Sequence, residues 1–171
     1  MGVDINSSRR RFLGTSLSTG AAAVISTRPT DAVAARPEKT VPGYPVISIS
    51  TVDQLSKLIT KNFNYPDESS PCMLVKLDSE VDGGVGPGKN IVAYSSMCTH
   101  MGCAVSYDQS TKTFQCPCHF SIFDAENNGQ MVCGHATENL PRIDLKQDPK
   151  TGHIVATGIQ GQIYGRISNV L

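Results

Sequence analysis

Beyond residue 40, the chain consists mainly of short runs in which apolar and polar residues alternate, separated by glycine, proline, aspartate and asparagine. A period of two is typical of strands that bury one face. The pattern predicts an all-β domain. The strands expected are Val46–Ser50, Asn62–Tyr65, Cys72–Leu77, Ile91–Ser95, Thr113–Gln115, Gln130–Cys133, Ile143–Lys146, His153–Thr157 and Gln162–Arg166.

Turns and one short helix are expected between these strands. The glycine-rich stretch Asp82–Asn90 predicts a long turn, and further turns are expected at Asp148-Pro149 and Gly158–Gly161. Only Val52–Ile59 has apolar residues at helical spacing, which predicts about two turns of helix. No internal repeat is present. The expected architecture is a small antiparallel barrel or sandwich with an insertion around two cysteine-rich loops.

The first 40 residues have a different pattern, which predicts an export signal. Arg9–Arg11 precede Phe12-Leu13 and a weakly apolar stretch, and an A-x-A sequence follows at Ala32–Ala34. These are the basic, apolar and small-residue parts of a signal peptide, and the paired arginines favour the Tat route. A basic tail beside an alanine-rich helix is the alternative. We expect a signal and linker over 1–40 and one domain over 41–171.

The signal segment also bears on localisation and charge. A helix over Leu13–Ser26 would be roughly 21 Å long, short of a ~30 Å hydrocarbon core, so no firm membrane span is expected. Retention of the signal would associate the protein with a membrane. Cleavage after Ala34 would remove four arginines and two aspartates from the 15 basic and 15 acidic residues, leaving a net charge of −2. Such a chain is not typical of nucleic-acid binding, and a periplasmic location, where disulfides persist, is expected.

Six cysteines and four histidines stand out in a chain of 171 residues without tryptophan. Two matched loops, Cys98–Cys103 and Cys116–Ser121, each contain a Cys and a His close together and one further Cys. The 15-residue spacer Met101–Gln115 is long enough for a hairpin that brings the loops face to face. Two thiolates and two imidazoles suit a structural zinc ion or a [2Fe–2S] cluster with two histidines on one iron.

The additional cysteine of each loop favours the cluster. Zinc needs only four ligands, which leaves Cys103 and Cys118, and a disulfide between them would join the loops. Zinc fingers also favour two cysteines on one arm and two histidines on the other, whereas each loop here offers one of each. A set of purely cross-linking cysteines is the third alternative.

The motifs C-T-H-M-G-C and C-P-C-H-F-S resemble the signature of Rieske iron–sulfur proteins. The resemblance implies a Rieske-type fold, a cluster-binding subdomain over about 96–141 and one [2Fe–2S] cluster whose histidine-bound iron faces solvent and exchanges electrons. The ligands and disulfide that it implies are Cys98 and Cys116 on one iron, His100 and His119 on the other, and Cys103 bonded to Cys118.

Residues beside these ligands bear on the reduction potential, which histidine ligation raises to roughly −150 to +300 mV. Ser121 is placed to donate a hydrogen bond toward cluster sulfur, which stabilises the reduced state. High-potential members of the family have Tyr where this chain has Phe123, so we expect one hydrogen bond fewer and a potential below that of quinol-oxidising complexes. Gly102 and Pro117, within the motifs, are also expected around the cluster.

The motif Gly134-His135-Ala136-Thr137 falls where the family has a Gly-Pro-Ala-Pro cover over the cluster, so the stiffness of the cover is in question. We expect His135 to make ordinary loop hydrogen bonds, the alternative being a third imidazole at the cluster. Met101 and Phe120 flank the ligand histidines and are expected either in a docking surface or packed within the subdomain.

Two cysteines and one histidine stand apart from this site. Cys72 and Cys133 lie in apolar strands and are expected to be buried free thiols, because buried cysteine behaves as a small hydrophobe. A second disulfide is the alternative in an oxidising compartment. His153 lies in a C-terminal strand and is assigned no role.

Longer stretches between Tyr44 and Leu171, such as Gly83–Pro87, Ala136–Pro141 and Ile163–Arg166, resemble the small Rieske subunit of arsenite oxidases. The resemblance implies an oxidoreductase subunit without substrate chemistry of its own. It would pass electrons from a large molybdopterin-containing subunit to a periplasmic cytochrome c or a blue-copper protein. The alternative is the Rieske subunit of a quinol–cytochrome c oxidoreductase, against which the weak apolar signal segment and Phe123 count. A binding-only module is the remaining possibility.

Overall fold

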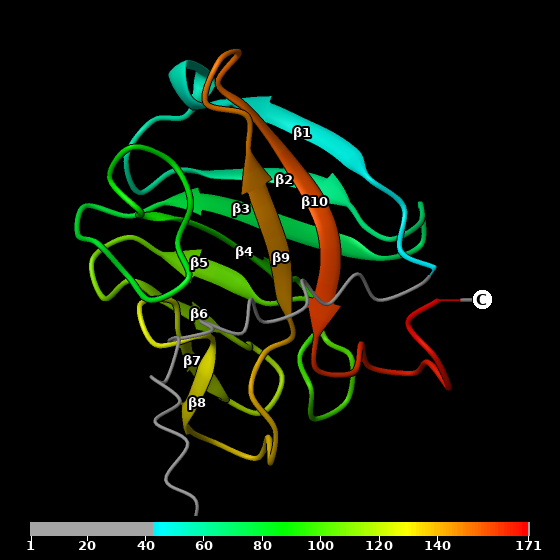
Figure 1. Cartoon of the computed structure of the whole chain (residues 1–171). Coiled ribbons are helices and arrows are strands. Elements are labelled where there is room, and N and C mark those ends of the chain that lie inside the picture. The colour runs from blue at the N-terminus through cyan, green and yellow to red at the C-terminus, as the bar shows by residue number, and fades with distance from the viewer. Residues whose placement is uncertain (1–42, 171) are drawn as a thin grey trace, which may run out of the picture. The chain divides into compact units, whose positions relative to one another are not determined.

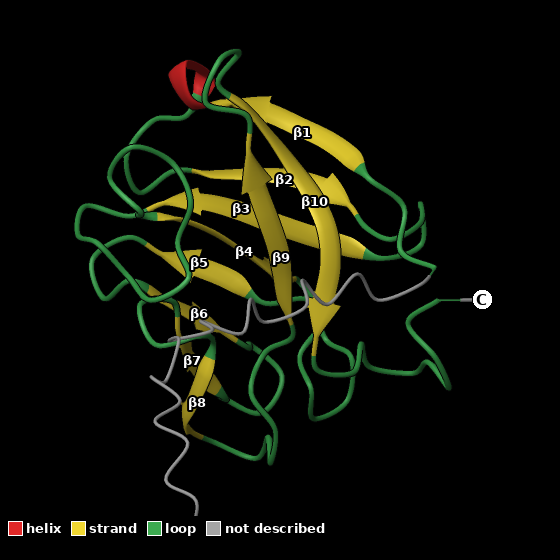
Figure 2. Ribbon diagram, viewed as in Figure 1, coloured by secondary structure: helices red, strands yellow, loops and turns green. Residues whose placement is uncertain are grey.

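A computed structural model describes residues 43–170, which lie within one compact unit, Lys39–Leu171. The predicted signal and linker over 1–40 fall outside the described residues. Figures 1 and 2 show strands throughout and one short 3-10 turn, η1 (Val52–Gln54). The strands are β1 (Ile47–Thr51), β2 (Thr60–Asn64), β3 (Pro71–Lys76), β4 (Ile91–Ser95), β5 (Ser106–Asp108), β6 (Thr113–Gln115), β7 (Ile122–Asp124), β8 (Gln130–Cys133), β9 (Arg142–Gln147) and β10 (His153–Gln160).

The strands form two antiparallel sheets, which confirms the all-β prediction. The larger sheet has the order β1-β10-β9-β4-β3-β2, and the smaller has the order β5-β6-β7-β8. All four strands of the small sheet lie between β4 and β9 in the sequence, so this sheet is an insertion into the larger one. The insertion carries both cysteine-rich loops. Among the described residues, no helix is long and apolar enough to cross a membrane.

The hydrophobic core has two parts, separated by β3 and β4. These strands are continuous apolar runs because they bury both faces. Alternate residues such as Leu74 and Ala93 enter one core with β9 and β10. Val75 and Tyr94 enter the other core, which contains Phe114 and Phe123 of the small sheet and the thiols of Cys98 and Cys116. The first cysteine of each loop is therefore packed in the second core, which holds both loops in place.

Most predicted strands are confirmed, and three of them (β4, β6 and β8) have the predicted bounds. The prediction did not include β5 and β7, which have only three residues each. Runs of three residues carry little alternating pattern, so strands of this length are found in some cases, as with β6, and missed in others.

Three predictions along the chain are wrong. Val52–Ile59 is not a helix, because η1 ends at Gln54 and Leu58 has φ 59° and donates its N–H to Lys76 O. A two-turn helix is marginal on its own, so these sheet contacts prevail. The turn expected over Gly158–Gly161 is mostly strand, because β10 runs on to Gln160 with a bulge between Ala156 and Gly158. The strand expected over Gln162–Arg166 is an irregular segment.

Candidate metal centre

The two cysteine-rich loops have the same backbone hydrogen bonds. In the first loop, Cys98 N–H donates to Cys103 O (2.8 Å) and Gly102 N–H donates to Cys98 O (2.9 Å). In the second, Cys116 N–H donates to Ser121 O (2.8 Å) and Phe120 N–H donates to Cys116 O (3.1 Å). The fifth residue of each loop has a left-handed backbone, with φ 72° at Gly102 and 57° at Phe120. Each loop is thus a tight turn that begins at a buried cysteine.

A disulfide joins the loops, between Cys103 and Cys118. The two cysteines that begin the loops, Cys98 and Cys116, are free and buried. The Cys116 sulfur lies within 4.8 Å of both disulfide sulfurs, but these are bonded to each other and offer no thiolate. Cys98 and Cys116 are therefore the two free thiols that these loops could offer to a metal.

The environment of Cys98 suits a sulfur ligand. Its thiol is in hydrogen-bond contact with that of Cys116. Burial raises the pKa of the Cys98 thiol, while hydrogen bonds from the backbone N–H groups of His100 and Met101 act in the opposite direction. Because N–H groups aimed at sulfur favour its anionic form, they would also stabilise a metal-bound thiolate.

The two loop histidines lie together. The ring centroids of His100 and His119 are 4.6 Å apart, and the rings are nearly perpendicular, at 87°. His100 Nδ1 is buried and has no hydrogen-bond partner among the described residues. Buried polar atoms rarely lack a partner. An unpaired, buried imidazole nitrogen in a loop that begins at a buried free thiol suits a metal ligand, so the residues present fit an iron–sulfur cluster.

A third imidazole lies beside this pair, contrary to our expectation for His135. Its ring stacks on that of His100 at 5.6 Å and 26° and lies 6.0 Å from that of His119. The sequence places His135 in the loop over the cluster but does not show which way the ring points. His153 is exposed and lies near Ser48, away from the loops in sequence and in the sheet.

The cover loop, 134–139, is attached to both cysteine-rich loops. Ser121 is fully buried, and its Oγ accepts a hydrogen bond from Ala136 N–H (3.0 Å). Thr99 Oγ1 donates to Glu138 O (2.8 Å). These two side chains hold the cover loop from either side, in a segment where the family resemblance leads one to expect prolines.

The other residues predicted around the cluster divide by exposure. Phe123 is fully buried within the second core, between β3–β4 and the small sheet. Pro117 is exposed. Met101 and Phe120 are 58% and 76% exposed, so the alternative in which they pack within the subdomain is wrong. Together with Val132 of β8, which is 60% exposed, they are apolar side chains open to solvent in the insertion between β4 and β9.

The two remaining cysteines differ from each other. Cys72 is buried in β3 as expected, and burial raises the pKa of its thiol to about 12. Cys133 is exposed, contrary to expectation, because β8 is the edge strand of the small sheet. Both are free, so the alternative of a second disulfide is also wrong.

Comparison with known proteins identifies the family. The model of the Rieske [2Fe–2S] domain matches residues 49–144. The iodate reductase subunit IdrB of Denitromonas iodatirespirans is 38% identical over 165 residues, covering 95% of this chain and 86% of that protein. IdrB of Pseudomonas sp. (strain SCT) is 35% identical over 164 residues, covering 92% and 82%.

Two further comparisons are more limited. The cytochrome bc1 complex Rieske subunit of Corynebacterium diphtheriae is 45% identical, but over 67 residues that cover 39% of this chain and 16% of that protein. The crystal structure of the soluble domain of Rieske protein II (soxF) from Sulfolobus acidocaldarius has the same fold, with a TM-score of 0.66 and 24% identity over 75% of this chain and 85% of that one. The matched domain, the paired thiols and the paired imidazoles agree: the chain belongs to the Rieske [2Fe–2S] family.

Proposed function

We propose that this chain is the electron-transfer subunit of a periplasmic oxidoreductase whose large subunit contains molybdenum. The observation that carries the proposal is the placement of the imidazoles. The His119 side chain is exposed, and Met101 and Phe120 beside it are open to solvent. A redox centre that ends at the surface among apolar side chains suits exchange of electrons with another protein. The similarity to iodate reductase subunits over nearly the whole chain supports the same role.

In this proposal, Cys98 and Cys116 hold one iron and His100 and His119 hold the other, His100 through its unpaired Nδ1. When bound, the cluster supplies one-electron redox chemistry at a potential raised by its histidine ligands. Ser121 retains a hydroxyl hydrogen to donate toward cluster sulfur, since its oxygen accepts from Ala136 N–H. The buried core below excludes water from the two cysteines.

Three histidines within 6.0 Å make the ligand assignment testable. His119→Ala should abolish the Rieske signal in the EPR spectrum of the reduced protein and lower its iron content. His135→Ala, the matched control, should retain both. Loss of the signal on replacement of His135 and not of His119 would contradict the assignment.

For the whole enzyme, we propose oxidation of arsenite at the large subunit. Electrons would pass singly to this chain and then to a cytochrome c or a blue-copper protein. Export of the folded, cluster-loaded chain by the Tat route is part of the proposal. A second candidate is iodate reduction, favoured by the two IdrB relatives. Electrons would then move in the opposite direction, since iodate consumes them.

Purification of the tagged full chain from its native cells distinguishes these candidates. We expect a large molybdenum-containing subunit to co-purify, and the complex to reduce a dye when arsenite is added. Oxidation of the reduced cluster by iodate, without arsenite activity, would establish the second candidate. Co-purification with cytochrome b and quinol-dependent reduction would contradict both and support the quinol–cytochrome c alternative.

The docking role of the apolar side chains can be tested separately. Phe120→Glu and Met101→Glu should slow electron transfer with the partner while leaving the EPR spectrum unchanged. Val46→Glu, a charge at an equally exposed apolar residue before β1, is the control. Unchanged assembly and transfer in both loop variants would show that these side chains do not take part in docking.

A further inference from the structure

The first cysteine-rich loop is covered by an aromatic ring from the end of the chain. A β-carbon added to Gly102 would lie 2.5 Å from Cδ1 and 2.8 Å from Cε1 of Tyr164, so the ring occupies the space that any larger side chain would need. Gly102 donates the hydrogen bond that closes the loop onto Cys98 O. The ring therefore lies directly on the turn that orients Cys98 and His100.

Tyr164 belongs to an irregular segment, 161–170, which we call the strap. Figure 1 shows it continuing past the end of β10. Within the strap, Asn169 Oδ1 accepts from Ile163 N–H (2.9 Å) and Asn169 Nδ2 donates to Gly161 O (2.7 Å). These two bonds join Asn169, which follows Tyr164, to the residues that precede it, so Tyr164 lies within a closed loop. The buried side chain of Ile163 anchors this loop to the protein.

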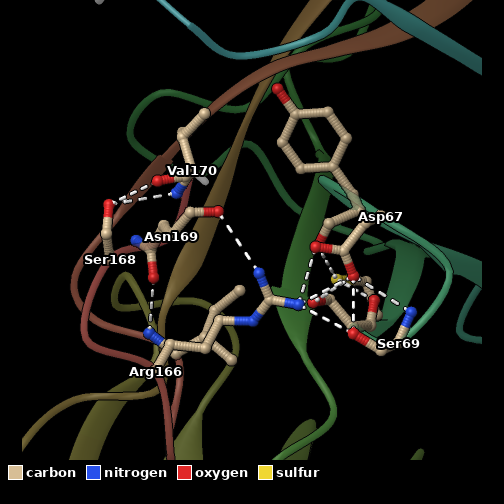
Figure 3. A network of polar contacts seen from close by, with 10 residues as sticks. Asp67, Ser69, Arg166, Ser168, Asn169 and Val170 are labelled. Atoms are coloured by element: carbon tan, nitrogen blue, oxygen red, sulfur yellow. Dashed lines mark hydrogen bonds and ion pairs between the residues drawn. The ribbon is translucent and has the colours of Figure 1, made fainter.

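A second set of contacts attaches the strap to the turn between β2 and β3. Arg166 Nη2 pairs with Asp67 Oδ2 (2.7 Å) and donates to Ser69 Oγ (2.8 Å), as Figure 3 shows. The Arg166 side chain is only 16% exposed. A partly buried guanidinium held by a carboxylate and a hydroxyl has little freedom. The position of Tyr164 is therefore fixed from both sides.

We infer that Tyr164 is a positioning residue for the cluster: the strap holds its ring against Gly102, and the ring holds the first loop in the geometry that the Cys98 and His100 ligands require. The family model ends at residue 144, so the strap lies outside the matched domain. Tyr164, which is itself 38% exposed, also covers one side of this loop at Gly102. Since reduction adds a negative charge, and the apolar shell around a metal site controls solvent access and potential, the ring holds the potential down.

The test replaces Tyr164 in the full chain and follows three properties: hydrogen exchange, the reduction potential and the EPR g-values. In Tyr164→Ala, hydrogen exchange at the Gly102 amide should become at least about tenfold faster, because its bond to Cys98 O opens more often. The reduction potential should rise and the EPR g-values should shift. Tyr164→Phe should restore all three, since the contact is made by ring carbons. Ile167→Ala, at a fully exposed strap residue, is the matched control and should change none of them.

Arg166→Gln provides a variant in which the ring itself is retained. We expect hydrogen exchange at the Gly102 amide to become faster than in wild type, but by less than in Tyr164→Ala. Folded Tyr164→Ala protein with wild-type exchange and potential would overturn the inference. The exchange measurement does not depend on which residues bind iron, whereas the potential does. Faster exchange with an unchanged potential would show that the ring holds the loop without affecting the cluster, which overturns its role as a positioning residue. Loss of the signal in His119→Ala tests the ligand assignment independently.

Discussion

The two cysteine-rich loops have one backbone design but different surroundings. In the first loop, the left-handed residue is Gly102, and Tyr164 of the strap covers it. In the second, the left-handed residue is Phe120, whose side chain is 76% exposed. A non-glycine residue in this conformation costs about 1 kcal/mol or more and persists where the surroundings hold it.

The difference separates two tasks. The first loop is held by the ring of Tyr164 from the strap, and its histidine has a buried, unpaired Nδ1. The second loop presents its histidine and an apolar side chain to solvent. We propose that a partner docks at the side of the site formed by the second loop. Variants that act on one loop and not on the other test this proposal.

Loss of the disulfide should have the largest effect. In the chain-entropy model, a cross-link that closes a 15-residue loop contributes about 3 kcal/mol, so Cys103→Ala combined with Cys118→Ala should lower the free energy of unfolding by about that amount. Denaturant unfolding measures it. In this double variant, amide hydrogen exchange should increase more at Phe120 than at Gly102, because the strap holds only the first of the two loops through Tyr164. An equal increase at both amides would contradict the proposed difference, and Cys133→Ala, at an exposed free thiol, serves as the control.

The two attachments of the cover loop should differ in strength. Ser121→Ala leaves the buried Ala136 N–H without a partner, which costs about 1–3 kcal/mol of stability. It also removes the hydroxyl donor proposed to act on the cluster, so the reduction potential should fall. Thr99→Ala removes the more exposed bond to Glu138 O and should cost less, with no change in potential. Thermal unfolding and redox titration of both variants provide the comparison, and a larger loss for Thr99→Ala would refute it.

The sequence was sufficient to predict an iron–sulfur site between the two loops. It was not sufficient to predict how the surroundings of the two loops differ. The resemblance of the two local motifs to the Rieske signature implied the disulfide and the paired Cys and His residues. The bounds of β4 could be predicted because a fully buried strand is a continuous apolar run. The stacking of His135 on His100 depends on how the cover loop folds back. The contact of Tyr164 with Gly102 joins residues 62 positions apart. No periodic pattern marks such a contact, and the segment of Tyr164 was instead predicted as a strand.

The effect of Phe123 on the potential should be smaller and confined to the second loop. Phe123→Tyr introduces the hydroxyl that high-potential Rieske proteins have, and one hydrogen bond of about 1 kcal/mol corresponds to a rise of about 40 mV for a one-electron couple. Phe114 pairs with Phe123 across β6 and β7 and is equally buried, so Phe114→Tyr is the matched control. We expect the control to lose stability without a rise in potential. Equal potentials in wild type and Phe123→Tyr would show that the missing hydroxyl does not set the potential.

The smallest effect should come from the attachment of the strap, and it should depend on pH. The Ser69 hydroxyl and the Arg166 guanidinium hold the pKa of Asp67 at about 2, below its ordinary value of 3.8. A carboxyl with a depressed pKa in the folded protein stabilises it above the unfolded-state pKa, and this contribution is lost as pH falls through the folded-state pKa.

The melting temperature of wild type should therefore exceed that of Asp67→Asn by a constant margin above about pH 5. The margin should shrink between about pH 4 and pH 2. Glu68→Gln, the exposed neighbour, should show no such margin. Because Asp67 holds the strap and Tyr164 of the strap contacts Gly102, hydrogen exchange at the Gly102 amide should respond to Asp67→Asn at neutral pH, and exchange at the Phe120 amide should not. A response at both amides would mean that the two loops are coupled through the disulfide more strongly than either is fixed by its own surroundings.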